Sequence, residues 1–580
     1  MLSRIFILIA LLIGFVYPSM SFNYESKYGN GSNVDNFTQD TTAYYYFENL
    51  LDVNLNYENI NLYSQLEYSN PPIYGQSLTK TNNLANSYFI EYFNDFLMLK
   101  WGHIQTINNY GLDINMFQDQ STDFDNRIKG IELNYMPNDL IEFSFITGKG
   151  NYGTKSYGDL RENDLIFSHE LDSYGMNIYS NFGDFSISTS SKRTNYKSGI
   201  YNNLINSDTR LSIDLQDYIF TDFSLFNQDS DVKSTAINFS YSKTLGDLDI
   251  YIENRANTYN KILRDEQEEG NYRYIALTGE FLGIGFTYEF KDYDMLYYMP
   301  ITSNPPTVFY ETSSVLISRI QHNINFSDEI GHQLEFRYNS EDKISYLFNL
   351  SMGMKHAGVR NPNSFEFDDD FNITFDTYQS VSFKDFFGDK IFNLNGGMDF
   401  LNENLRAHKP FKNIYFEKSV WNEDNSFFYK LGFHSHVSYD DASGKNYQSL
   451  TVPIQFVIGF DNQNSLTAYT EYQHTKNLVA NFDDFDQDFY TNKHLALSYY
   501  FNKIGNITYL MDEEIKTSYI DGTSKKNKWD GIEFSIKMSP TMQLSIFKGS
   551  QKGGLVCANG VCAVQPSFEN GTKITFRALF

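Results

Sequence analysis

The last ten residues of the chain, 571–580, alternate between two kinds of side chain with a period of two. One side of an extended strand would carry Ile574, Phe576, Ala578 and Phe580, and the other side would carry Lys573, Thr575, Arg577 and Leu579. The first side is apolar and the second is mostly polar. Alternation of this kind predicts a strand that separates two different environments.

The same alternation recurs through most of the chain. Pairs of alternating segments are separated by a few turn-forming residues, as in 51–68, 131–145, 237–252, 334–350 and 532–546. Between such pairs lie longer polar stretches, such as 106–126, 193–230, 293–311 and 355–370. Short turns therefore alternate with long loops, which is typical of up-and-down β-barrels.

We count about a dozen tight turns flanked by about two dozen strands, and bacterial single-chain barrels have an even number of strands. The sequence therefore predicts an all-β fold, a large transmembrane antiparallel up-and-down β-barrel of about 24–26 strands, or about 22 if one region is misread. Its turns are expected to be short on the periplasmic side and its loops long on the extracellular side. A soluble sandwich would not sort its loops by length, and we find no propeller repeat.

The start of the chain predicts export. A short positive start is followed by an apolar run over residues 5–16, then by Pro18 and the small-x-small segment Ser19-Met20-Ser21. The run is shorter than the roughly 20 residues that a membrane-spanning helix needs, so we predict a Sec-type signal peptide over residues 1–21.

Residues 22–40 are rich in Gly, Asn and Ser and carry little apolar periodicity. We predict an N-terminal lead-in segment here. A small internal plug element and a poorly patterned first strand are the alternatives. The barrel itself is predicted over residues 41–580.

Composition agrees with an outer-membrane location in a Gram-negative bacterium. The chain contains 51 Phe and 45 Tyr, which suits aromatic girdles at both membrane interfaces. An aromatic C-terminus is typical of the strand that the barrel assembly machinery recognises, so we predict Ile574, Phe576 and Phe580 as the assembly signal. Outer-membrane lipid and lipopolysaccharide are then the expected surroundings.

The charge excludes one class of partner. Asp and Glu number 72 against 45 Lys and Arg, a net charge of −27, whereas nucleic acid binding needs basic patches. Acidic clusters at 368–370 and 483–488 do not match a calcium loop in spacing. We interpret them as solvated loop charge that divalent cations could bridge to lipopolysaccharide, with specific calcium binding as the alternative.

The chain shows no enzyme signature. The motifs G-x-S-x-G and H-E-x-x-H and the phosphate loop do not occur, and the ten His are scattered. We therefore expect no enzyme activity and no cofactor.

The two cysteines of the chain are close in sequence. In Cys557-Ala558-Asn559-Gly560-Val561-Cys562, the Asn-Gly pair is typical of a two-residue hairpin turn. Cys557 and Cys562 would then lie opposite each other with Cα atoms about 4.5 Å apart, at the near edge of the disulfide range. Because exported chains meet oxidising conditions, we predict a disulfide in a hairpin that faces the outside.

Several polar residues are predicted to line the lumen. His434 and His436 lie two apart on one strand, and Lys430 shares their side. Such a His pair could hold a metal or bind a ligand carboxylate, and it could equally be polar lining of a wet lumen. The other predicted lining residues are Glu289, Glu335, Arg337 and Glu533, and Tyr251, Phe89 and Leu347 are expected to face inward as well.

Three stretches carry a resemblance to a known family. They are residues 25–33, residues 101–135 with Tyr110-Gly111-Leu112 and the segment 125–130, and residues 553–580 with the Cys hairpin and aromatic end. Together they resemble an uncharacterised outer-membrane β-barrel protein family found mainly in Bacteroidetes-like bacteria. The resemblance implies export and a barrel, and it implies no catalytic or binding residues. We see no counterpart of the plug domain of TonB-dependent receptors, which argues against energised uptake.

We therefore expect a porin-like passive channel or the membrane shell of a transport system, with no substrate indicated. The alternative is a structural or interaction barrel that serves as a subunit or docking platform of a secretion or surface complex. A pore needs a continuous wet path, whereas a scaffold can have a filled lumen.

Deletion of Phe580 should impair assembly more than replacement of Arg577, because the aromatic end is the predicted recognition element. Cell fractionation and the heat-dependent migration of unboiled protein on a detergent gel would measure assembly. Recovery of the wild-type chain only in the soluble periplasm would contradict the prediction.

Overall fold

The computed structural model describes residues 19–34, 41–73, 81–119, 124–154, 167–196, 230–260, 267–294, 302–303, 305–307, 310, 312–319, 328–340, 343–354, 365–367, 372–375, 378–382, 411–422, 424, 426–440, 445–460, 463–479, 488–502, 504–518, 523–558, 561–565 and 567–580.

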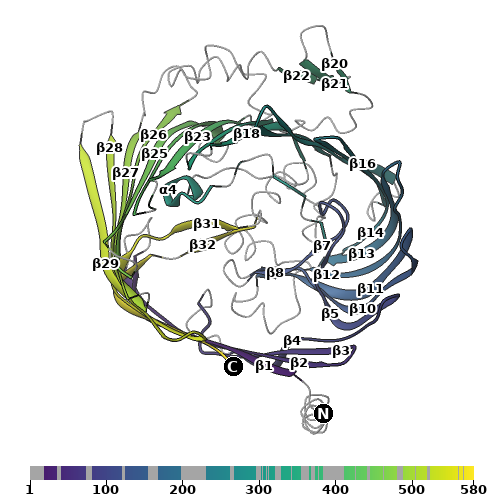
Figure 1. Cartoon of the computed structure of the whole chain (residues 1–580), viewed down its shortest axis with the longest axis horizontal. Helices are drawn as coiled ribbons and strands as arrows, with labels where there is room; N and C mark the ends of the chain where they lie inside the picture. The colour runs from purple at the N-terminus through teal and green to yellow at the C-terminus, as the bar shows by residue number, and fades with distance from the viewer. Residues whose placement is uncertain are drawn as a thin grey trace.

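A closed antiparallel sheet forms the wall of a barrel (Figure 1). Within the described residues this sheet connects 26 strands, of which β8 (Gln118–Asp119) and β9 (Phe124–Asp125) attach through β11 without forming part of the wall. The other 24 strands are β1 (Ser19–Val34), β2 (Thr41–Tyr57), β3 (Ile60–Ser69), β4 (Thr81–Phe93), β5 (Leu97–Ile104), β10 (Ile128–Asn138), β11 (Ile141–Thr154), β12 (Phe167–Ile178), β13 (Asp184–Tyr196), β14 (Ser230–Leu245), β15 (Leu248–Asn260), β16 (Gln267–Phe281), β17 (Ile284–Asp294), β18 (Asp328–Asn339), β19 (Ile344–Met354), β23 (Phe411–Trp421), β24 (Phe427–Asp440), β25 (Lys445–Gly459), β26 (Ser465–Val479), β27 (Asp488–Phe501), β28 (Gly505–Ser518), β29 (Ser524–Ser539), β30 (Met542–Gln551) and β33 (Phe568–Leu579).

The barrel closes where the first wall strand meets the last. β1 pairs with β33 from Asn23↔Leu579 to Ser32↔Glu569, and β33 pairs on its other side with β30. Beyond the end of β33, the backbone N–H of Phe580 donates to the carbonyl of Phe22, and the N–H of Phe22 donates to the carbonyl of Phe580. Closure removes the free edges of the sheet, so the backbone groups of the wall are paired without water.

This seam corrects the predicted start of the barrel at residue 41. Residues 19–34 form β1 and pair with β2 and β33, so the part of 22–40 that they cover belongs to the wall and is not a lead-in segment. Among the alternatives, the poorly patterned first strand is the one found. Residues 1–18 lie outside the described residues, and the signal peptide stays a prediction.

The weak pattern of β1 has a physical cause. A Cβ atom at Gly29 would lie 2.1 Å from the ring of Tyr46, and one at Gly31 would lie 2.9 Å from the ring of Phe568. Both rings are buried. Aromatic rings from neighbouring strands thus cover glycines of β1, an arrangement that stabilises a strand without giving it an apolar repeat.

The two faces of the wall differ in polarity. In β14, Ile237 and Phe239 are exposed, whereas the alternating Asn238 and Ser240 are buried. Other strands repeat this arrangement, with exposed large apolar side chains that include Trp101, Ile131, Phe143, Ile252, Leu431, Tyr472, Leu497 and Ile532. A closed barrel that is apolar outside and polar inside is the architecture of an outer-membrane β-barrel.

The connections at the two ends of the barrel differ in length. At one end they are short turns, such as residues 58–59, 246–247, 282–283 and 540–541. At the other end the longest connections are residues 105–127, 197–229, 295–327 and 355–410. Gly246 and Gly283 have φ values of 63° and 77°, which side chains with a Cβ rarely adopt, so these two-residue turns favour glycine.

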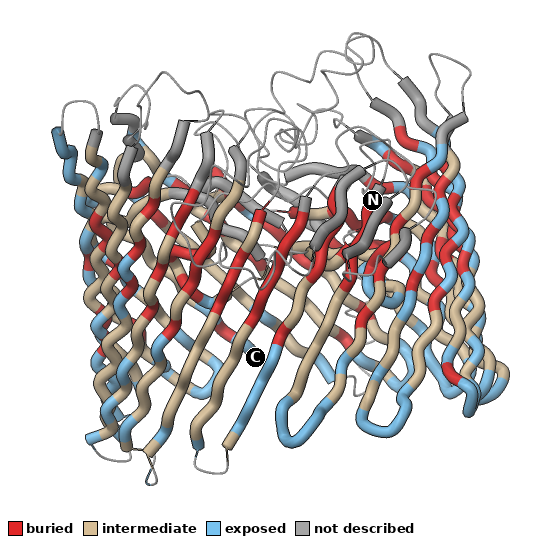
Figure 2. The backbone as a smooth tube through the Cα atoms, turned by 90° about the horizontal axis from the view of Figure 1, so that it is seen from above, coloured by how far each residue is buried: buried red, intermediate tan, exposed pale blue. Residues whose placement is uncertain are grey.

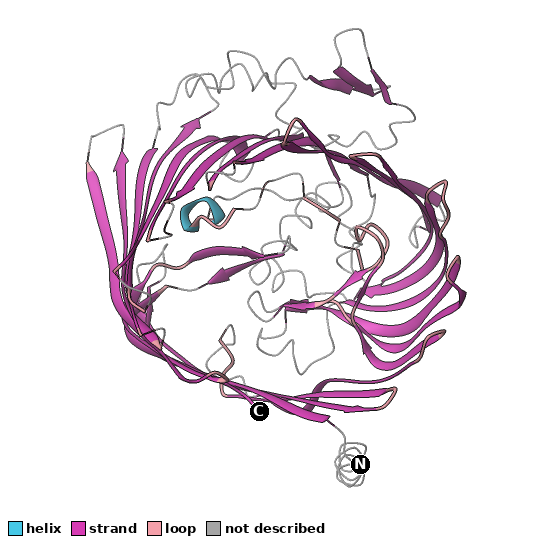
Figure 3. Cartoon of the chain, viewed as in Figure 1, coloured by secondary structure: helices cyan, strands magenta, loops and turns pink. Residues whose placement is uncertain are grey.

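Three connections place elements inside the ring of strands (Figures 1 and 3). These elements are β6 (Thr106–Ile107), β7 (Asn115–Met116) and β8, the short helix α4 (Val315–Ser318), and the hairpin of β31 (Gly554–Ala558) and β32 (Val561–Gln565). A separate sheet is formed by β20 (Phe365–Phe367), β21 (Asn372–Phe375) and β22 (Tyr378–Ser382). In the part of the chain that the structure describes, no helix is long and apolar enough to cross a membrane.

Burial changes along the barrel axis. Figure 2 shows buried residues gathered toward the end of the long connections and exposed residues toward the end of the short turns. Near the short turns, inner side chains remain accessible, with 64% of the Arg337 side chain and 62% of the Arg577 side chain exposed. The lumen is therefore occupied by protein toward the long connections and solvated toward the short turns.

The cysteine hairpin has the predicted register but a different position. β31 and β32 pair with Cys557 opposite Cys562. The sequence prediction placed this hairpin outside, whereas it lies within the ring of strands and contacts α4 (Figure 1). Lys552 accounts for the difference, because its Nζ donates to Glu514 Oε2 at 2.5 Å and holds the base of the hairpin against β28. The disulfide stays a prediction.

Replacement of both cysteines by Ser should leave the barrel intact, because the wall closes through β30, β33 and β1 without the hairpin. The bridge would close a very short loop, so it should stabilise the fold by less than the roughly 3 kcal/mol expected for a 15-residue loop. Heat-dependent gel migration measures the barrel. Thiol titration of the unreduced wild-type protein tests the bridge, and two free thiols would exclude it.

Candidate functional site: a polar layer across the lumen

Two inward segments, the described residues of 105–127 and of 302–319, together form what we call the lumen layer. The first segment packs apolar side chains against the wall. Ile114 and Met116 are buried in one cluster with the inward Ile146 and Leu171 of β11 and β12. The first segment thus covers an apolar patch that Ile146 and Leu171 form on the inner wall.

Side chains of the 125–130 motif fix one end of this segment. The Asn126 side chain accepts a hydrogen bond from the Phe117 N–H at 2.7 Å and donates to the Asn115 carbonyl at 2.8 Å. Arg127 binds both carboxylate oxygens of Asp125, at 2.9 and 3.0 Å. Its second terminal nitrogen donates to Ser87 Oγ at 2.7 Å. The motif noted in the sequence therefore holds the inward loop against the wall.

A buried charge pair fixes the middle of the segment. Asp113 is fully buried and accepts hydrogen bonds from Ser190 and Ser188 of β13, at 2.8 and 3.3 Å. The Nε atom of Arg255, on β15, lies 3.4 Å from Asp113 Oδ1. Arg255 also donates to the Leu112 carbonyl at 2.5 Å. A buried charge needs such partners, so this pair specifies where the segment lies.

Ser303 joins the two segments of the lumen layer. Its hydroxyl donates to the Asp113 carbonyl at 3.0 Å and accepts a hydrogen bond from Arg255 at 2.6 Å. The backbone N–H of Asn115 donates to the Thr302 carbonyl at 2.6 Å. The same arginine thus contacts both segments.

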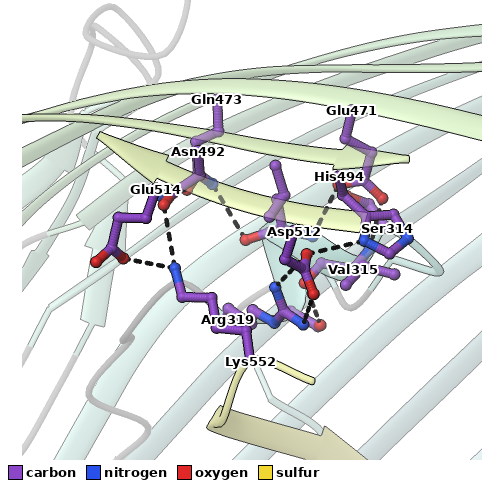
Figure 4. Close-up of polar contacts among 12 residues, drawn as sticks. Ser314, Val315, Arg319, Glu471, Gln473, Asn492, His494, Asp512, Glu514 and Lys552 are labelled. Carbon is purple, nitrogen blue, oxygen red and sulfur yellow. Dashed lines mark hydrogen bonds and ion pairs between the residues drawn. The ribbon is translucent and has the colours of Figure 1, made fainter. Parts of the chain in front are cut away.

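The second segment is anchored on the part of the wall that lies across the ring in Figure 1, through the contacts drawn in Figure 4. Glu471 of β26 accepts hydrogen bonds from Ser314 Oγ and from the N–H groups of Val315 and Leu316, each at 2.7 Å. Past α4, Arg319 binds Asp512 of β28 at 3.0 and 3.3 Å. Two carboxylates of the wall therefore hold both ends of α4.

Aromatic and aliphatic contacts complete this anchor. The ring of Tyr310 lies 5.4 Å from the ring of Tyr415, and Ile317 packs with Tyr415 and the inward Leu347. Burial raises the pKa of Tyr310 to about 12. The phenol therefore stays neutral at physiological pH.

The predicted His pair lies on β24 with Lys430. The rings of His434 and His436 are buried and stacked 6.2 Å apart. His436 hydrogen-bonds to the Asn413 side chain and to Ser438, and Lys430 forms an ion pair with Glu417 at 3.2 Å. Within the described residues, no three His, Cys, Asp or Glu side chains are grouped to hold a metal. The acidic clusters at 368–370 and 483–487 lie outside the described residues.

The remaining predicted lining residues take part in inner-wall contacts. Glu289 forms an ion pair with Lys291 at 2.9 Å, and Glu335 forms one with Arg337 at 2.5 Å. Glu533 accepts a hydrogen bond from Ser535 at 3.1 Å. Adjacent inward cations thus offset two of these carboxylates.

Sequence reasoning did not find the anchors of the lumen layer. Asp113, Ser303 and Ser314 lie in loops without periodicity, and their partners are far away in sequence. The one available signal was the pair of loop motifs, Tyr110-Gly111-Leu112 and 125–130. The first motif lies in the first inward segment, and the second joins the end of this segment to β10.

No family model and no curated protein matches the chain. Among solved structures, it is similar to the siderophore receptor PirA from Pseudomonas aeruginosa, with 7% identity and a TM-score of 0.41 over 97% of this chain and 81% of that chain. It is also similar to the copper transporter OprC (9%, 0.42, 97% and 80%) and to the translocation pore of the P pilus usher PapC (9%, 0.38, 96% and 99%). At these identities and TM-scores the similarities carry no conclusion about solute or mechanism.

Replacement Glu471→Gln should loosen α4 from the wall. Hydrogen bonds to a charged group contribute about 1.5–3 kcal/mol each and neutral ones about half as much, so amide exchange in residues 312–319 should become at least about tenfold faster. Hydrogen–deuterium exchange with mass spectrometry would measure this.

The matched control is Glu513→Gln. Glu513 lies on β28 and pairs with Lys493 and Lys526, at 2.9 and 2.6 Å, away from α4. Exchange in 312–319 should not change in this variant. Unchanged exchange in Glu471→Gln would show that the carboxylate does not hold the segment.

Proposed function

We propose that this protein is an outer-membrane transport barrel that lets small polar solutes pass through a lumen narrowed by its own loops. The proposal includes export by a Sec-type signal peptide, insertion by the barrel assembly machinery, and short turns on the periplasmic side. The lumen layer would then lie in the extracellular half. No catalytic role and no cofactor form part of the proposal.

The solvated inner wall is the observation that carries the proposal. On the side of the short turns, charged inner residues such as Arg337, Arg577 and Glu25 form ion pairs while much of each arginine stays accessible. A water-filled path requires a polar wall of this kind. The lumen layer is attached through discrete polar anchors, which narrows the path at one level without filling the whole barrel with apolar side chains.

One observation favours the second candidate, a structural or interaction barrel. Ser303 and Arg255 link the two segments of the lumen layer to each other and to β15, and this link spans part of the lumen. A barrel closed in this way could serve as a docking platform of a surface complex. Conductance separates the two functions.

The purified protein should form small, cation-preferring channels in planar bilayers. Charge is costly at the middle of the lipid-facing surface, so most of the net charge of −27 is expected in loops, at the ends of the wall and in the lumen. Near the short turns, Asp52, Glu142 and Asp249 accept hydrogen bonds from neutral groups such as Tyr63, Tyr179 and Thr244. Such carboxylates raise the local cation concentration, an effect that salt screens over about 10 Å at 0.1 M.

Reversal potentials across a KCl gradient measure the preference. The double variant Asp52→Asn, Glu142→Gln should reduce it, whereas Glu513→Gln on the outer face should not. Anion selectivity would contradict the assigned lining. Absence of current at any voltage, in both the wild type and Glu471→Gln, would favour the structural barrel.

A further inference from the structure

Tyr110 belongs to a cluster of three tyrosines on the inner wall. Its ring lies 4.4 Å from the ring of Tyr251 and 4.8 Å from that of Tyr274, and these two rings lie 5.9 Å apart. Tyr274 is fully buried, whereas Tyr110 keeps 42% of its surface exposed. Tyr110 thus presents an accessible aromatic surface inside the lumen.

The backbone fixes the position of Tyr110. The residue lies in a tight turn in which the Gly111 N–H donates to the Asn108 carbonyl at 2.9 Å. Asn109 and Gly111 on either side both have positive φ, 51° and 81°. Directly after the turn, the Leu112 carbonyl accepts the hydrogen bond from Arg255. The backbone at Tyr110 is therefore held by contacts that do not involve the tyrosine ring.

A cavity of about 440 Å³ lies beside Tyr110, on the inner side of β13–β16 and of the turn before β13. This volume is within the range of about 300–1,000 Å³ that small-molecule sites have. Its lining combines two tyrosine rings with hydroxyls and carboxylates. The polar members that matter here are Asp184, Ser242, Thr244, Asp249 and Thr278.

The charges that face the cavity select against anions. Asp184 and Asp249 lie on the inward side of β13 and β15, whereas Lys243 pairs with the outward Ile250 and its Nζ donates to the Asn181 carbonyl at 2.6 Å. A ligand with many hydroxyls can donate to both carboxylates and exchange hydrogen bonds with the hydroxyls of Ser242, Thr244 and Thr278. Inward carboxylates beside abundant hydroxyls therefore favour a polyhydroxylated ligand.

The tyrosine ring supplies the other half of sugar recognition. A pyranose has an apolar C–H face that packs on an aromatic ring and hydroxyls at its rim that form hydrogen bonds. Burial, together with the negative charges of Glu289, Asp249 and Glu253, raises the pKa of Tyr110, so its hydroxyl stays a neutral donor. Tyr110 can then contribute both its face and its hydroxyl.

We propose that this cavity is a binding site for a neutral mono- or disaccharide, which contacts Tyr110 with its ring face and Asp184, Asp249 and Thr244 with its hydroxyls. The inference deepens the proposed transport function by naming a class of solute, and it rests on that function for its biological role. Binding itself can be measured without any current.

Isothermal titration of the full chain in detergent with glucose and with maltose tests the site. At least one sugar should bind, and Tyr110→Ala should weaken binding by about tenfold or more, as expected for loss of a central aromatic contact. Tyr110→Phe should retain most of the binding. The matched control, Tyr310→Ala, removes a lumen-layer tyrosine on the other segment and should leave binding unchanged.

Heat-dependent gel migration verifies that each variant is folded. The proposal is overturned if neither sugar binds the wild type at up to about 10 mM. Equal losses in Tyr110→Ala and Tyr310→Ala would also overturn it, as would binding of the diamine putrescine in place of sugar at Tyr110. Sugar binding by a protein that carries no current would reject the channel and retain the site.

Discussion

Backbone hydrogen bonding in lipid is the constraint on which the rest of this structure depends. Each N–H and C=O group of the wall needs a protein partner, and the seam between β1 and β33 supplies the last of them. The mutual hydrogen bonds of Phe22 and Phe580 extend this seam to the final residue of the chain. Closure determines the ring, and the ring gives every wall strand one face toward lipid and one toward the lumen.

The polar inner face creates the second requirement, which is to pair buried charges. Where loops cover the wall, inner residues lose water and must find partners within the protein. Arg255 does so with Asp113, Leu112 and Ser303, and Glu471 does so with the N-terminal residues of α4. These contacts give the lumen layer a defined place. They also leave the wall near the short turns solvated, because no described segment covers Arg337 or Arg577 to the same extent.

The combination of an occupied and a solvated level gives the lumen its proposed selectivity. Carboxylates hydrogen-bonded to neutral groups near the short turns favour cations at that mouth. The Tyr110 cavity adds a tyrosine face and several hydroxyls, which suit a polyhydroxylated solute. Both features belong to one path, since Asp249 contributes to the acidic mouth and to the lining of the cavity.

The alternation of the sequence determined the architecture. Segments such as 237–252 predicted both their pairing and their lipid side, because a period of two follows directly from strand geometry. Three features depend on the tertiary structure and were not predicted from the sequence. β1 has no apolar repeat because its glycines are covered by Tyr46 of the next strand and by Phe568 of the last strand. Lys552 holds the cysteine hairpin inside the ring through its contact with Glu514. The lumen layer is held by contacts such as that between Arg255 and Leu112, which are 143 residues apart. Loops have no period, so only the closed ring, which brings distant side chains together, decided where they lie.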